Sequence, residues 1–125
     1  MFLNIILVFI GGGFGSLARY GMGELVRWSG ETNFPLATLL SNVLSCVVMG
    51  LALGFFGDKL LEHPWLRLLV VIGFCGGFST FSTFSSETLE LFRNGHAVYG
   101  IINIAVSLLL CIFILFLLIK KSPVS

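Results

Sequence analysis

Charged residues are scarce in this chain. They make up 10% of its 125 residues, whereas hydrophobic residues make up 57%. An average soluble domain carries about 25% charged residues, so this composition excludes a soluble fold and predicts an integral membrane protein with the lipid bilayer as its partner. The net charge is only +1 and no basic run is longer than Lys120-Lys121, so nothing indicates a nucleic-acid partner.

Groupings of residues that would carry catalysis or bind a transition metal are also missing. No nucleophile–base constellation is present, so an enzyme is not predicted. Cys46, Cys75 and Cys111 lie in apolar runs without CxxC or Cys/His spacing, and we expect them to pack as small hydrophobes. His63 and His96 lie on different connections and share no ligand spacing. The function must therefore reside in other residue types.

Four apolar runs are long enough, or nearly so, to cross a bilayer, which takes about 20 residues per helix. They are residues 2–18, 34–56, 66–92 and 97–119. The first run has no positively charged stretch before it and no small-x-small cleavage site after it, so we interpret it as a retained span. The alternating segments of a membrane β-barrel are missing. The sequence predicts an all-α bundle of four transmembrane helices in a single domain, residues 1–125.

Positive charge is nearly balanced between the two ends of this bundle. The end that holds both termini has Lys59, Arg67, Lys120 and Lys121, and the opposite end has Arg19, Arg27 and Arg93. Positive charge on cytoplasmic loops normally fixes orientation. The balance therefore predicts a chain that inserts both ways up and assembles as an antiparallel homodimer. Because four packed helices fill their own centre, a solute path would lie between subunits.

Small residues recur at every fourth position near the end of the first run. Gly11-x-x-x-Gly15 and Gly12-x-x-x-Ser16 predict close approach of a neighbouring helix. Arg19 follows directly, and we expect it to end the span and either snorkel to the interface or cap main-chain carbonyl groups.

The second run carries a polar stripe. Thr38, Ser41, Asn42 and Ser45 recur at offsets of three and four, which places them on one face of a helix. Burying an amide without partners costs about 2–7 kcal/mol, so Asn42 needs an explanation. Two interpretations stay open: polar contacts that hold helices together, or the wall of a solvated path.

The third run contains "GFCGGFSTFSTFSSETLELF", residues 73–92. Glycine weakens a helix by about 1 kcal/mol relative to alanine. The glycines predict either a tight helix crossing or a break near residues 76–80, whose freed carbonyl groups would hold a cation. If residues 79–87 are helical, Phe81 and Phe84 lie on one side and the hydroxyl groups on the other. Glu87 ends the hydroxyl face, where it would face a vestibule.

Hydroxyl groups, an amide and phenyl rings suit a small anion. Hydroxyl and amide groups donate hydrogen bonds, and the edge of a phenyl ring is positive. Such groups can hold an anion without a full positive charge that would trap it, and conduction requires binding that is easily reversed. The residues therefore predict a path for a small anion.

The chain resembles the Fluc/CrcB family of fluoride channels over nearly its whole length. The resemblance rests on "GGGFGSLARY", on the spacing from Thr38-Leu39 to Asn42, and on "GFCGGFSTFSTFS". It implies passive fluoride export across the bacterial cytoplasmic membrane by an antiparallel dimer with two pores. It also implies a central sodium ion on the main-chain carbonyls of Gly76 and Ser79. The implied fluoride path comprises Phe81, Phe84, Asn42, Thr38, Ser82, Thr83 and Ser85, with Tyr99 and Ser107 as weaker candidates, and Arg19 matches the family's arginine.

The main alternative is a small multidrug-resistance-type exporter, which also has four spans and dual topology. Such a proton-coupled exporter needs an acidic residue in its first span, and none lies between Met1 and Arg19. A membrane scaffold without transport would leave Asn42 and the hydroxyl residues unexplained.

Overall fold

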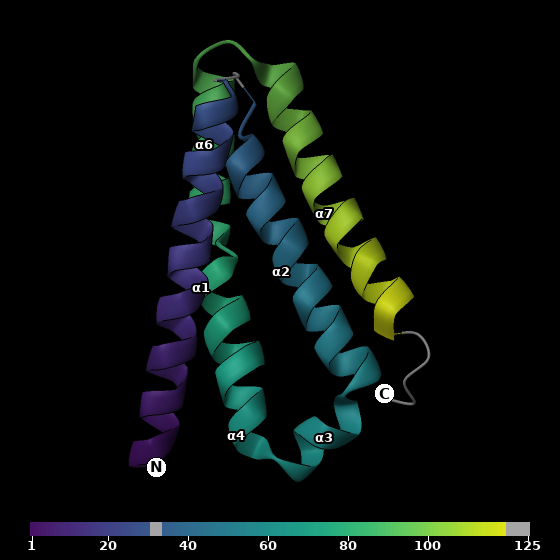
Figure 1. Ribbon diagram of the computed structural model, residues 1–125. Coiled ribbons are helices and arrows are strands. Elements are labelled where there is room, and N and C mark those ends of the chain that lie inside the picture. The colour runs from purple at the N-terminus through teal and green to yellow at the C-terminus, as the bar shows by residue number, and fades with distance from the viewer. Residues whose placement is uncertain (31–33, 120–125) are drawn as a thin grey trace.

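The computed structural model describes residues 1–30 and 34–119, which form an all-α bundle (Figure 1). Within these described residues, four helices are long and apolar enough to cross a membrane: α1 (Phe2–Ser29), α2 (Leu36–Phe55), the composite helix Pro64–Arg93 and α7 (Ala97–Ile119). A short helix, α3 (Gly57–Glu62), connects α2 to the composite helix. The prediction of four transmembrane helices without strands is confirmed for the described residues.

The composite third helix is irregular. It consists of α4 (Pro64–Arg67), the π-helix η1 (Leu68–Cys75), α5 (Gly76–Phe78) and α6 (Phe81–Arg93). Ser79 and Thr80 have extended backbone conformations and separate α5 from α6. The expected break is therefore present, but it lies after the two adjacent glycines. Gly76 itself is helical, with φ −63° and ψ −35°.

The first span is longer than predicted. We expected residues 2–18 ended by Arg19, but α1 continues to Ser29 and Arg19 lies inside it. One basic side chain does not end a helix when its head group finds a partner inside the protein, and the Arg19 Nε donates to the Gly77 carbonyl oxygen at 3.1 Å. Arg27 and Glu24 form a 2.7 Å ion pair three residues apart in the added turns.

This correction changes the charge count at the bundle ends. Arg19 lies within α1, so Arg27 and Arg93 remain at one end. The opposite count included Lys120 and Lys121, which lie outside the described residues. Among the described residues, two positive charges lie at each end: Lys59 and Arg67 at one, Arg27 and Arg93 at the other. Within the part of the chain that the structure describes, positive charge is therefore evenly divided between the two ends.

The predicted close approach of helices is confirmed between α1 and the third helix. A Cβ at Gly11 would overlap the Leu69 carbonyl oxygen, and one at Gly15 would overlap that of Phe74. Gly77 approaches the Gly12 carbonyl in the same way. The sequence left a tight crossing and a break as alternatives for the third helix. Both occur: Gly77 belongs to the crossing, whereas Ser79 and Thr80 form the break.

Substitution of Gly15 by alanine should destabilise this crossing. The added methyl group overlaps a backbone oxygen that cannot rotate away, and overpacking of this kind costs about 1–3 kcal/mol. Gly13→Ala is the matched control, since a Cβ at Gly13 meets no described heavy atom within 4 Å. Thermal unfolding in detergent should show a lower midpoint for Gly15→Ala alone. Equal midpoints for the two variants would contradict the packing argument.

Candidate functional site

Thr80 is the N-cap residue of α6, and its cap ends the break in the third helix. Its φ and ψ are −153° and 117°, and its Oγ1 accepts a hydrogen bond from the Thr83 backbone N–H at 3.2 Å. The same Oγ1 donates to the Thr83 hydroxyl at 3.1 Å. A threonine cap satisfies one of the donors that a helix start leaves unpaired. The threonine cap thus allows the helix to begin again at Phe81.

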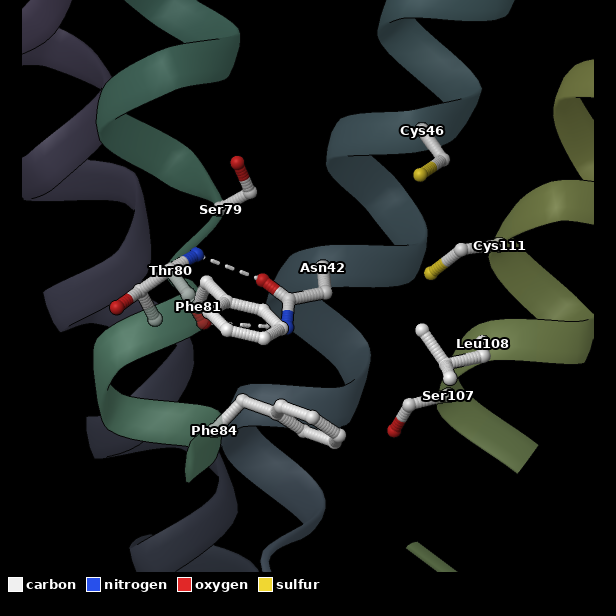
Figure 2. Close-up of a pocket in the computed structure, with 9 residues that line it drawn as sticks. All are labelled: Asn42, Cys46, Ser79, Thr80, Phe81, Phe84, Ser107, Leu108 and Cys111. Carbon is white, nitrogen blue, oxygen red and sulfur yellow. Dashed lines mark hydrogen bonds between the residues drawn. The ribbon is translucent and has the colours of Figure 1, made fainter. Parts of the chain in front are cut away.

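Asn42 of α2 holds the extended segment from the side (Figure 2). The Thr80 backbone N–H donates to Asn42 Oδ1 at 2.8 Å, and Asn42 Nδ2 donates to the Thr80 carbonyl oxygen at 3.4 Å. One amide side chain thereby satisfies both main-chain polar groups of Thr80. This contact explains how an asparagine is accommodated in an apolar span, because its own polar atoms are paired as well.

Side chains from α1, α2 and the break itself donate hydrogen bonds to main-chain carbonyl groups next to the break. Arg19 of α1 caps the Gly77 carbonyl at 3.1 Å. Ser45 of α2 donates to the Cys75 carbonyl at 3.1 Å, and the Ser79 hydroxyl donates to the same oxygen at 2.8 Å. Irregular backbone at membrane depth is stable when protein groups satisfy it in this way.

Among the carbonyl groups at the break, those of Gly76 and Ser79 lose their usual donors. In a continuous helix the Thr80 N–H would donate to the Gly76 oxygen, but it donates to Asn42 instead. The Thr83 N–H would donate to the Ser79 oxygen, but it donates to the Thr80 hydroxyl. Gly76 is also exposed, with no described heavy atom within 4 Å of an added Cβ. The released oxygens of Gly76 and Ser79 therefore fit the prediction that these two carbonyls hold a hard cation.

A pocket of about 230 Å³ opens beside the break, between α2, α6 and α7 (Figure 2). Phe81 and Phe84 line it, with ring centroids 5.7 Å apart and ring planes inclined by 38°. Phe84 is buried, whereas the Phe81 side chain is 75% exposed. The pocket is lined by Asn42, Cys46, Ser79, Thr80, Phe81, Phe84, Ser107, Leu108 and Cys111. This lining contains phenyl rings, an amide, hydroxyl groups and thiols without a charged side chain.

A buried polar chain continues from this pocket between α6 and α7, and sequence reasoning missed most of it. Ser107 donates to Asn103 Oδ1 at 3.2 Å, and Asn103 Nδ2 donates to the Thr88 hydroxyl at 2.9 Å. Thr88 donates in turn to the Phe84 carbonyl at 2.7 Å. Asn103 is only 1% exposed. An asparagine in an otherwise apolar run was the signal that could have revealed it.

The remaining predicted path residues lie outside this pocket. Thr38 is buried, and Glu87 borders a second hollow of about 250 Å³ near Glu90 and His96. This position agrees with a vestibule. The Tyr99 ring packs 5.9 Å from the His96 ring, centroid to centroid, near the same end.

The break divides the hydroxyl residues that the sequence predicted on one helix face: Ser79 and Thr80 lie in the break, and the others lie in α6. Ser79 and Thr80 are extended, so treating residues 79–87 as one helix was wrong, and the single hydroxyl face does not form. Ser82 and Ser85 are exposed away from the pocket, although the Ser82 hydroxyl lies 3.3 Å from Thr80 Oγ1. Thr83 is half-buried beneath the Thr80 cap. The adjacency of Phe81 and Phe84 survives because both lie in α6.

The fold and the site define a multi-pass α-helical membrane protein whose third helix is interrupted beside an uncharged, phenyl-lined pocket. Residues 6–119 match the family described as CrcB-like protein, Camphor Resistance (CrcB), and the chain belongs to this family.

Curated relatives cover most of the chain. It is 38% identical over 110 residues to a protein of Ruminiclostridium cellulolyticum, spanning 88% of this chain and 85% of the relative. It is 39% identical to a Coxiella burnetii protein, over 88% and 90% of the two chains. A Dehalococcoides mccartyi protein is 41% identical over 91% and 88%. All three relatives are named fluoride-specific ion channel FluC.

Proposed function

We propose that this protein is a fluoride-selective channel that lets fluoride leave the cell passively across the bacterial cytoplasmic membrane. The observation that carries the proposal is the pair of adjacent phenyl rings, Phe81 and Phe84, in an uncharged pocket next to a helix break. The names of the relatives supply the anion and describe a channel, so they favour neither an enzyme nor a proton-coupled exporter.

The pocket chemistry suits fluoride. Ring edges present positive hydrogens to an anion. The Asn42 amide has two N–H donors, and the contact with the Thr80 carbonyl uses one of them, so the other is available to an anion in the pocket. No charged side chain lines the pocket, which keeps binding weak enough for release.

The working unit in this proposal is an antiparallel homodimer. Phe81 belongs to the path but is 75% exposed in one chain, so a second copy would complete the wall on that side. With two equivalent pockets in such a dimer, two pores follow. The antiparallel arrangement comes from the family resemblance and agrees with the similar numbers of positive charges at the two ends of the bundle.

The proposal includes a sodium ion at the break. The candidates to hold it are the main-chain oxygens of Gly76 and Ser79, both released from helical hydrogen bonds by side-chain contacts at Thr80. Unwound carbonyl groups of broken membrane helices are suited to Na⁺. Bound there, the ion would supply a fixed positive charge that steadies the break, while Asn42 and Arg19 hold its neighbouring main-chain groups.

Reconstitution into liposomes tests the proposal. We expect rapid fluoride efflux, followed with a fluoride-selective electrode, and no chloride efflux above that of empty vesicles. Absence of fluoride flux from folded protein would reject the channel. Cation uptake driven by a proton gradient in the same vesicles would instead favour the exporter.

A further inference from the structure

Two cysteine side chains face each other across the pocket. Cys46 of α2 and Cys111 of α7 both line it, and their sulfur atoms point toward one another (Figure 2). Both thiols are free and half-buried, and both lie on the wall of the same pocket. The third cysteine, Cys75, is fully buried and donates to the Ser45 carbonyl at 3.6 Å. No spacing motif pairs Cys46 with Cys111, because 65 positions separate them.

The packing of α2 against α7 fixes this pairing. Cys46, Gly50 and Gly54 recur at every fourth position, so they share one face of α2. The two glycines pack on Leu118, which lies seven positions after Cys111 and therefore on the same face of α7. Because a Cβ at Gly54 would overlap the Leu118 carbonyl oxygen, the two backbones are in contact at that level. The register that seats these glycines also places the two thiols opposite each other.

Two facing thiols are a ligand set for a soft metal ion. Thiolate sulfur is the ligand that soft metals prefer. Structural zinc takes four ligands, so a two-thiol site suits an ion that accepts two sulfur atoms in a line. Binding follows M²⁺ + 2 RSH → M(SR)₂ + 2 H⁺, and the product is neutral. Neutrality matters at this depth, since a net charge in a membrane span costs several kcal/mol; a monovalent ion would leave one negative charge.

We propose that Cys46 and Cys111 form a binding site for a soft divalent metal ion of the Hg²⁺ type, and that the bound ion obstructs the pocket beside Phe81 and Phe84. The metal site itself stands on the two thiols alone. Only the consequence for conduction rests on the proposed fluoride function. A heavy ion between α2 and α7 would reduce a volume of about 230 Å³ and tie the two pocket walls together.

Mass spectrometry of the purified protein tests the site independently of transport. With Hg²⁺ and an excess of a small monothiol, wild-type chains should retain one mercury that has displaced two protons and carries no external ligand. Cys46→Ser and Cys111→Ser should each retain mercury about 100-fold less well, because a second ligand held in place raises affinity by about 10² to 10⁴. Cys75→Ser is the matched control and should behave like the wild type.

Two results would overturn this site. Retention of mercury by Cys46→Ser and Cys111→Ser at the wild-type level would exclude the pair. A mercury-linked dimer under denaturing conditions would show that the thiols of two copies meet rather than those of one chain. Neither result depends on whether the protein conducts fluoride.

The flux assay tests obstruction. In liposomes, Hg²⁺ should reduce the fluoride flux of wild-type and Cys75→Ser protein at least about tenfold, and excess dithiol should restore it. Each serine variant at position 46 or 111 should keep its own mercury-free flux. Unchanged wild-type flux with mercury bound would place the ion outside the path and refute obstruction. A wild-type protein that conducts no fluoride would reject the proposed function, and the mass measurement would still decide the metal site.

Discussion

Replacement of Phe81 by isoleucine should reduce fluoride flux about tenfold or more in liposomes, while chloride remains excluded. Isoleucine keeps an apolar side chain of similar bulk but has no positive ring edge for an anion. Contacts of aromatic rings are worth about 0.5–1.5 kcal/mol, and about 1.4 kcal/mol corresponds to a tenfold change in rate. The loss of flux should exceed the effect of one aromatic contact, because the Phe84 ring 5.7 Å away also loses its neighbour.

The control for this substitution is Phe113→Ile. Phe113 lies in α7 and is 55% exposed, among apolar side chains on a different face from Ser107 and Cys111. Its loss should leave flux within about twofold of the wild type, since surface substitutions away from special features change stability by about 0.5 kcal/mol or less. Size-exclusion chromatography should show the same assembly for both variants. Wild-type flux in Phe81→Ile would remove this ring from the path.

Span positions could be predicted from the sequence because they depend on apolar length alone. The runs at 34–56 and 97–119 lie within a few residues of α2 and α7. The end of α1 could not be predicted in the same way. Arg19 has the composition signal of a helix end, but its partner is the Gly77 carbonyl, 58 positions away. Only the folded bundle brings these two groups together, and their hydrogen bond lets α1 continue.

The exact position of the break could not be predicted from the sequence either. Glycine content pointed to Gly76 and Gly77, because glycine weakens helices. The backbone instead becomes extended at Ser79 and Thr80, where Asn42 supplies a substitute for the helical partners. The glycines serve the crossing with α1, which needs their lack of a side chain. Local propensity therefore predicted that the helix breaks, and a tertiary contact decides where.

The polar chain between α6 and α7 was missed for a different reason. Asn103 lies in the most apolar run, where its polar neighbours Tyr99 and Ser107 at offsets of four form only a sparse stripe. Its partners are Thr88 and Ser107, one of them on another helix. Every asparagine within a span requires hydrogen-bond partners, because its amide is costly to bury unpaired. Applied to the whole sequence, this requirement would have identified Asn103 as well as Asn42.

Replacement of Asn42 by leucine should strongly reduce conduction without unfolding the bundle. Leucine removes the acceptor for the Thr80 N–H and the donor for its carbonyl. Each buried group left unpaired costs about 1–3 kcal/mol, so the extended segment becomes unfavourable. In a continuous helix the acceptor for the Thr80 N–H is the Gly76 oxygen. We therefore expect the break to close toward a helix, which shifts Phe81 and withdraws one of the carbonyls proposed for sodium. Fluoride flux should fall about a hundredfold, since two such groups are worth about 2.7 kcal/mol or more.

Ser45→Ala is the matched control for Asn42→Leu. Ser45 lies nearly one turn further along the same face of α2 and also contacts the break, through the Cys75 carbonyl. That oxygen keeps the Ser79 N–H and hydroxyl as donors, at 3.0 and 2.8 Å, so the extended segment should persist. We expect Ser45→Ala to keep flux within about threefold of wild type, the effect of roughly 0.5–1 kcal/mol for one neutral hydrogen bond. If both variants conduct like the wild type, the Asn42 contact does not maintain the break. If both lose conduction equally, the α2 face as a whole matters, rather than the pairing of one amide with Thr80.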